Sequence, residues 1–357
     1  MPLATVDDSG SQCYYEDTGA PPNSSDYTTL VLIHGAGHQG AVFGRLFDRA
    51  AKHNMRLVAV NMRDYARSTP YSQSELGDLR SADVERQAAA LRARGLEVVV
   101  FLLWYIRKER IPPLSANTHE GRIGGGGISL LGWSWGCKMA LSCVARAQDL
   151  QLGDRELLAG YIRALILFDP SPRVFGAPML PIEDCFNPFY DTSSTPEETQ
   201  KNFPEWVSSY YLHSPVVLDA LHSDGYAELA KVLNADVIAR SHIFYEFLDG
   251  EVYKDTMRRA LHDTSIWPGL RVVLLWCDMS VSAVVMSSWG LLKEYHGDWP
   301  AGGRRIDAVR MKGANHFPHW DYPEQTMQLL ADIIWSEDSV PSVVQMDDTP
   351  EDVQSWL

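Results

Sequence analysis

Residues 128–137 read Ile-Ser-Leu-Leu-Gly-Trp-Ser-Trp-Gly-Cys, and this stretch decides the fold of the chain. Residues 128–131 form a short apolar run, typical of a strand buried in a parallel sheet, and a helical pattern follows over 137–148. Between them lies the motif Gly132-Trp-Ser134-Trp-Gly136, a Gly-x-Ser-x-Gly in the strand-turn-helix context that this motif requires. The glycines permit a tight, strained turn. We therefore expect the Ser134 hydroxyl to project from the sheet edge beside a helix N-terminus, where a developing negative charge is stabilised.

Strand and helix patterns alternate on both sides of this stretch. Short apolar, β-branched runs predict further strands at residues 28–33, 57–60, 164–168, 271–276 and 306–311. Helical spacing predicts helices at residues 39–53, 83–110 and 323–335, the second of them ended by Pro112 and Pro113. This alternation predicts an α/β fold with a doubly wound, mostly parallel sheet.

About a hundred residues separate the strands at 164–168 and 271–276, far more than the ~2–6 of an ordinary connection. We therefore expect a helical cap, inserted before the penultimate core strand. The expected organisation is a core at 1–169 and 269–335, a cap at 170–268 and a loose acidic tail at 336–357. Aromatic residues are frequent in the cap and either form its own core or line an apolar pocket: Phe175, Phe186, Phe189, Tyr190, Phe203, Trp206, Tyr210, Tyr211, Phe244, Tyr245 and Phe247.

Composition excludes several classes of protein. The formal net charge is −15, from 31 Lys and Arg against 46 Asp and Glu, so nucleic acid is not an expected partner. The cysteines are odd in number and lack CxxC spacing, which predicts reduced thiols without disulfides or a metal site: Cys13, Cys137, Cys143, Cys185 and Cys277. Neither a signal peptide nor an apolar run of membrane-spanning length is found, and we expect a cytoplasmic protein without a membrane span.

A serine hydroxyl becomes a useful nucleophile only when a neighbouring base takes its proton. His316 is the expected base, because it lies between the last predicted strand and the closing helix, in Gly313-Ala-Asn-His-Phe-Pro-His. His319 is the rival, although the Gly-x-x-His spacing favours His316.

The segment His34-Gly-Ala-Gly37 follows the strand at 28–33. Its backbone N–H at Ala36, or at Gly37, is expected to form an oxyanion hole together with the N–H of Trp135. A glycine turn without a catalytic role is the alternative. His34 itself is expected to be a structural residue.

Together these motifs resemble the α/β-hydrolase superfamily from about Thr28 to Ile334, and Asn61-Met-Arg-Asp-Tyr-Ala-Arg-Ser68 is similar to an Asp-Leu-Arg-Gly-His-Gly-x-Ser stretch common there. Parts of the chain further resemble a group of fungal members. The resemblance implies a cofactor-free serine hydrolase that cleaves a small ester, thioester or lactone with an apolar or aromatic acyl group, through an acyl-serine intermediate. Hydrolysis of a C–C bond or acyl transfer on the same triad is an alternative, and so is a ligand receptor with a weak or inactive triad.

The resemblance leaves the third member of the triad open. In the superfamily the acid usually stands a few residues after the strand matching 271–276, where this chain has Ser280. Asp278 lies two residues earlier, whereas Asp169 ends the strand at 164–168, where certain haloalkane dehalogenases have their acid. Either aspartate can also be an ordinary turn residue. We favour Asp169 and keep Asp278 as the alternative.

Overall fold

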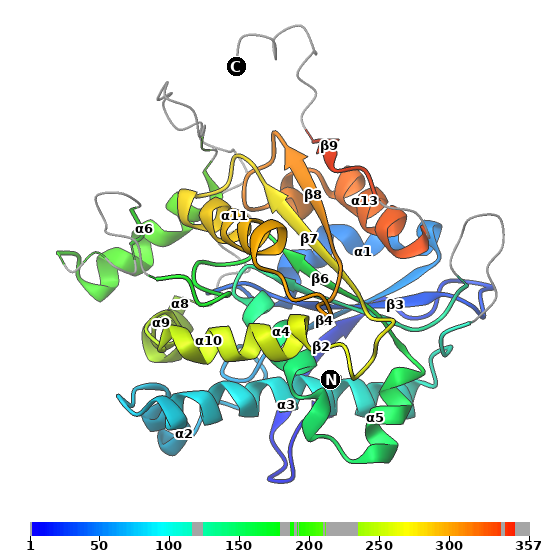
Figure 1. The fold of residues 1–357 in the computed structure, drawn as a ribbon, viewed down its shortest axis with the longest axis horizontal. Helices are drawn as coiled ribbons and strands as arrows, with labels where there is room; N and C mark the ends of the chain where they lie inside the picture. Colours follow the sequence, from blue (N-terminus) through cyan, green and yellow to red (C-terminus); the bar gives the residue numbers. More distant parts are fainter. Residues whose placement is uncertain are drawn as a thin grey trace, which may run out of the picture.

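The computed structural model describes residues 2–115, 124–178, 186–188, 191, 193–209, 211, 235–336 and 340–346. At its centre is a nine-stranded sheet in the order β1-β2-β4-β3-β5-β6-β7-β8-β9 (Figure 1). Its strands are β1 Leu3–Thr5, β2 Gln12–Asp17, β3 Thr28–Ile33, β4 Met55–Val60, β5 Ile128–Trp133, β6 Ile162–Phe168, β7 Arg271–Cys277, β8 Ile306–Lys312 and β9 Val343–Gln345. The pairs β1–β2 and β2–β4 are antiparallel, and every other pair is parallel.

The prediction of a doubly wound, mostly parallel sheet is confirmed. Strands β3, β4, β5 and β6 are buried along their whole length, because helices cover both faces and leave no position for a polar side chain in water. Parallel strands end at the same edge, so the residues that follow β3, β5, β6 and β8 meet there.

Helices pack on the two faces of the sheet (Figure 1). On one face α1 (Gly44–Ala50) contacts α13 (Pro323–Trp335), and on the other α3 (Val84–Glu109) contacts α4 (Gly136–Ala145). The side chain of Asp83 caps the start of α3 by accepting the Glu85 N–H. The remaining core helices are η1 Gly40–Phe43, η2 Ala51–His53, α2 Gln73–Leu79, η3 Ala147–Asp149, α5 Leu152–Ala159, α11 Ser282–Gly297 and α12 Pro318–Asp321.

The described secondary-structure elements of the insertion after β6 are all helices. It contains α6 Pro196–Ser208, α8 Ala235–Val237, the π-helix η5 Ile238–His242, α9 Ile243–Glu246, α10 Gly250–Met257 and the π-helix η6 Arg258–His262. Its last two helices, α10 and η6, pack on α4 of the core. Figure 1 shows α10 alongside α4. The cap boundary at residue 268 stays a prediction.

The expectation of a loose tail from residue 336 is wrong for residues 343–345. Strand β9 adds to the sheet edge beside β8, and the Met346 N–H continues the pairing by donating to the Lys312 carbonyl (2.9 Å). Three residues are too few to show a strand pattern in the sequence, and pairing with an existing edge supplies the order.

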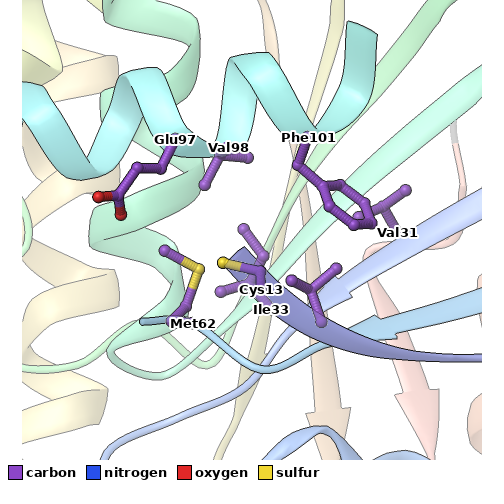
Figure 2. Close-up of a pocket in the computed structure, with 8 residues that line it drawn as sticks. Cys13, Val31, Ile33, Met62, Glu97, Val98 and Phe101 are labelled. Atoms are coloured by element: carbon purple, nitrogen blue, oxygen red, sulfur yellow. The ribbon is translucent and has the colours of Figure 1, made fainter. Parts of the chain in front are cut away.

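A small cavity lies between α3 and the sheet (Figure 2). Figure 2 shows apolar side chains of the sheet and of α3 around it, with Glu97 at its margin; its lining is Cys13, Val31, Ile33, Val60, Met62, Glu97, Val98 and Phe101. No residue expected at the catalytic site lines this cavity. The four described cysteines have free, buried thiols, and Cys185 lies outside the described residues. Within the described part of the chain, no helix combines the length and apolar character needed to cross a bilayer.

Candidate active site

Ser134 lies on a sharp turn between β5 and α4. Its backbone has a φ of 55°, a left-handed conformation that is strained for a residue with a side chain. The Ser134 N–H donates to the Phe168 carbonyl (2.9 Å) and holds the turn against β6. A Cβ atom at Gly132 would stand 2.4 Å from the Gly136 carbonyl oxygen, and one at Gly136 equally close to that of Ile33. The motif therefore requires glycine at both positions because backbone segments touch there.

His316 lies in the loop that joins β8 to α12. The Trp133 indole N–H donates to the His316 carbonyl (3.0 Å), and the two rings lie 5.1 Å apart. The Asn315 side chain connects this loop to the insertion, because its amide donates to the Ser208 carbonyl at the end of α6 (2.7 Å). The neighbouring residues therefore hold the expected base in a fixed, buried position.

Of the two candidate aspartates, Asp169 is the one that contacts His316. His316 Nδ1 donates to Asp169 Oδ2 (2.5 Å), and both side chains are buried. The other carboxylate oxygen, Oδ1, accepts the N–H of Cys277 (2.9 Å), and the Asp169 N–H donates to the Leu275 carbonyl (2.7 Å). Strand β7 thus holds the carboxylate by one of these hydrogen bonds and the Asp169 backbone by the other. A φ of 45° at Asp169 turns the chain away just after β6.

Asp278 serves a different purpose and does not reach His316. Its Oδ2 accepts hydrogen bonds from Arg310 Nε (2.8 Å) and Nη2 (2.5 Å), and its Oδ1 accepts the Gly313 N–H (2.8 Å). These contacts brace the start of the loop that carries His316. At the position where the superfamily usually has its acid, the Ser280 hydroxyl lies 3.2 Å from His316 Nδ1.

The backbone donors expected for an oxyanion hole differ in availability. The Gly37 N–H donates to the Tyr65 hydroxyl (3.2 Å). The N–H groups of Ala36 and Trp135 have no protein acceptor among the described residues. Of the two alternatives in this loop, the structure leaves Ala36 available for a ligand and occupies Gly37.

The other histidines near the site do not contact Asp169. Burial lowers the pKa of His34 to about 4, and the neutral ring donates from Nδ1 to the Gly35 carbonyl (2.9 Å) and accepts the Met62 N–H at Nε2 (3.2 Å). Burial also holds the pKa of His319 well below its usual range. Its ring packs against aromatic residues of the core: Phe43, Trp133, Phe168 and Phe317. Both rings are therefore structural.

Residues of the insertion cover the segment 34–37, in which the oxyanion hole is expected; this segment is called the oxyanion loop below. A Cβ atom at Gly37 would lie 2.7 Å from the Ile238 side chain and 3.7 Å from the Phe203 ring. Of the aromatic residues expected in the cap, Phe175, Phe203 and Tyr245 are buried and Phe186 and Phe247 are exposed. Phe189, Tyr190 and Tyr210 lie outside the described residues. Ser134 is 6% exposed, and among the described residues it forms no hydrogen bond with His316.

Two residues at the site were not found from the sequence. Tyr65 lies in the stretch Asn61–Ser68, where the superfamily pattern has glycines and a histidine, so its departure from that pattern was the available signal. His242 carries no such signal, because only the folded chain brings the insertion against Tyr65.

A parallel sheet with a serine on a strained strand-to-helix turn and a histidine after the last core strand defines the class of α/β-hydrolases. The model of the alpha/beta hydrolase family matches residues 30–329, and the chain belongs to this family. Comparison of the sequence with curated proteins finds no match.

Solved structures share the fold at low sequence identity. A serine hydrolase from Cycloclasticus zankles superposes with a TM-score of 0.56 at 10% identity, covering 93% of this chain and 97% of that one. An esterase from Thermogutta terrifontis gives 0.54 at 13% identity, with coverage of 93% and 97%. A putative ancestral haloalkane dehalogenase gives 0.54 at 16% identity, with coverage of 94% and 98%. These structures differ in activity, so they support the fold and leave the reaction open.

Proposed function

We propose that this protein is a serine hydrolase that cleaves a small carboxylic ester, thioester or lactone through an acyl-serine intermediate. The observation that carries the proposal is the buried hydrogen bond of 2.5 Å from His316 Nδ1 to Asp169 Oδ2, on loops that meet the strained turn of Ser134. An aspartate in this contact fixes the tautomer of the ring and stabilises the imidazolium that forms when the ring takes a proton.

The mechanism proceeds in two steps. Ser134 Oγ attacks the acyl carbon while His316 Nε2 takes its proton, and the same nitrogen then protonates the leaving oxygen or sulfur. In the second step water, deprotonated by His316 Nε2, attacks the acyl carbon; the bond from this carbon to Ser134 Oγ then breaks, and His316 returns the proton to Oγ. In both steps the negative charge develops on the former carbonyl oxygen, and the N–H groups of Ala36 and Trp135 stabilise it there.

The acyl group is proposed to be apolar. Phe203 and Ile238 lie over Gly37, beside the donors that would bind the acyl oxygen. Burial of apolar acyl carbons against these side chains contributes roughly 25 cal/mol per Å². Among the described residues, the three atoms nearest to a Cβ placed at Gly37 all belong to these two apolar side chains.

The test combines turnover with covalent labelling. Purified protein should hydrolyse p-nitrophenyl butyrate, and a fluorophosphonate should label the tryptic peptide that contains Ser134. Ser134→Ala should abolish both signals without loss of folding. His316→Ala should lower turnover by orders of magnitude, whereas His319→Ala is the matched control and should cost far less. Turnover in Ser134→Ala within a few-fold of wild type would refute the assignment.

One observation favours a second candidate function, a ligand receptor with an inactive triad. Ser134 and His316 are not hydrogen-bonded to each other among the described residues, and Ser134 is nearly buried. Tight binding of an apolar ester without turnover, and with no fluorophosphonate adduct on Ser134, would support this candidate over the hydrolase.

A further inference from the structure

The hydroxyl of Tyr65 connects the oxyanion loop to the insertion. It accepts the Gly37 N–H (3.2 Å) and lies 3.4 Å from His242 Nδ1. The Tyr65 ring packs edge-on against His34 and beside Trp135, with centroids 4.2 and 5.9 Å away. Tyr65 and His242 are both buried, so no water replaces these contacts at low cost.

The ion pair between Lys138 and Glu246 lies beside His242. Glu246 Oε1 accepts from Lys138 Nζ (2.9 Å), and His242 Nε2 faces the same oxygen at 3.8 Å, beyond hydrogen-bond distance. Burial holds the pKa of His242 well below its usual range, so the ring is neutral. A neutral ring next to a carboxylate has its proton on Nε2, which leaves Nδ1 to accept the Tyr65 O–H.

These contacts form one polar network that runs from helix α4, which follows Ser134, to the oxyanion loop. Lys138 belongs to the first turn of α4, four residues after Ser134. From Lys138 the network continues through Glu246 and His242 of the insertion to Tyr65, and it ends at the Gly37 N–H. The insertion also packs on Gly37 directly, through the side chain of Ile238.

We propose that Tyr65 and His242 are positioning residues that hold the oxyanion loop so that the Ala36 N–H, and not the Gly37 N–H, faces the reacting oxygen. The part of the insertion from Ile238 to Glu246 thereby controls whether the oxyanion loop has the conformation that catalysis requires. This inference rests on the proposed hydrolase function. Tyr65 and His242 do not touch the reacting atoms. The Tyr65 hydroxyl accepts the Gly37 N–H and thereby fixes the peptide plane between Ala36 and Gly37.

The test compares Tyr65→Phe with Tyr71→Phe. Tyr71 is a matched control: its hydroxyl is also buried and also binds the insertion, at the hydroxyl of Tyr245 (3.0 Å), but it does not touch the oxyanion loop. Tyr65→Phe should lower kcat for p-nitrophenyl butyrate roughly tenfold to hundredfold, less than the ~10²–10³ of a lost donor, with KM within about threefold. The rate of fluorophosphonate labelling should fall in parallel. Tyr71→Phe should keep kcat within about twofold.

His242 is tested in the same way. His242→Leu should reproduce the kcat loss of Tyr65→Phe, and His242→Asn should recover part of it, because an amide oxygen can stand near the position of Nδ1. Equal effects of Tyr65→Phe and Tyr71→Phe, or a loss confined to KM, would overturn the inference.

Amide hydrogen exchange separates this inference from the proposed function. Exchange at Gly37 should accelerate in Tyr65→Phe and His242→Leu but not in Tyr71→Phe, whether or not the wild-type protein turns over an ester. Unchanged exchange at Gly37 in Tyr65→Phe would overturn the positioning role even in an active enzyme. Failure of the wild-type protein to hydrolyse or to be labelled would overturn the hydrolase assignment alone.

Discussion

At the residue scale, the side-chain directions of Asp169 and Asp278 decide which of the two aspartates contacts His316. Asp169 and Asp278 both follow parallel strands, and such strands end at one edge of the sheet, so the sequence placed both near His316. The register of β7 and β8 separates them: Trp276 pairs with Arg310, which brings this guanidinium to the Asp278 carboxylate. An ion pair between residues so far apart in sequence has no local signal, and this is why the aspartates could not be distinguished beforehand.

We predict that Asp169→Asn lowers kcat by about 10⁴ with little change in fold, because the ring of His316 then loses its carboxylate and takes the wrong tautomer. Asp278→Asn should lower kcat by less than about tenfold and should lower stability, because the start of the loop that carries His316 loses its ion pair with Arg310. Steady-state kinetics and urea unfolding of both variants measure the two effects. A large kcat loss in Asp278→Asn with near-normal Asp169→Asn would reverse the assignment.

Ser280 offers a sharper version of this test. Its hydroxyl is 3.2 Å from His316 Nδ1, so a carboxylate at this position can reach the same nitrogen. The double variant Asp169→Asn, Ser280→Asp should recover roughly tenfold or more of the lost kcat. The matched control is Asp169→Asn combined with Ser280→Asn, which has the same size without the charge and should recover nothing.

At the element scale, the long apolar or strongly periodic segments were predictable and the short or mixed ones were not. Strand β3 and helix α3 match their predicted ranges closely, since each carries a sustained pattern. Strand β2 (Gln12–Asp17) was missed, because polar residues at both of its ends interrupt the apolar run. Helix α10 looks like any amphipathic helix in sequence, and only the folded chain shows that it packs on α4.

We predict that the two parts of the insertion differ in local stability. Backbone amides of α10 should exchange as slowly as those of the sheet, because this helix packs on α3 and α4. Amides of α6 should exchange faster, and they should slow when a fluorophosphonate adduct forms on Ser134, because α6 is tied to the histidine loop by the hydrogen bond from Asn315 to Ser208. Equal protection of α6 and α10 without a response to the adduct would mean that the insertion is a rigid accessory domain.

At the scale of the whole molecule, buried charges connect separate parts of the fold. Arg63 and Arg94 both bind Glu97 Oε1, at 2.9 and 2.7 Å, and both also bind Glu75. These pairs join the segment after β4 to α2 and α3. Removal of one partner leaves a buried charge uncompensated, which typically costs about 3–5 kcal/mol. Lys138 and Glu246 make the corresponding connection between α4 and the insertion.

Several histidines are buried in the neutral form, and together they make the stability of the whole molecule depend on pH. Burial lowers the pKa of His34 to about 4 and that of His38 to about 3, and it holds those of His242 and His319 well below the usual range. Between about pH 6.5 and pH 4 the unfolded chain therefore binds protons that the folded chain does not. Stability is fully present above pH 6.5 and is lost as the pH falls through this window. Carboxylates with lowered pKa values, such as Glu75 at about 2, add their own loss only below about pH 4.

We predict that His319→Phe reduces this acid sensitivity. The imidazole lies among aromatic rings, and neither of its nitrogens has a hydrogen-bond partner among the described residues, so a phenyl ring suits the same space without a proton to bind. In urea unfolding between pH 7.5 and pH 5, the free energy of unfolding of the wild type should fall more steeply than that of the variant by about 1.4 kcal/mol per pH unit below pH 6. Equal slopes for wild type and His319→Phe would show that His319 does not titrate differently in the folded and unfolded chains.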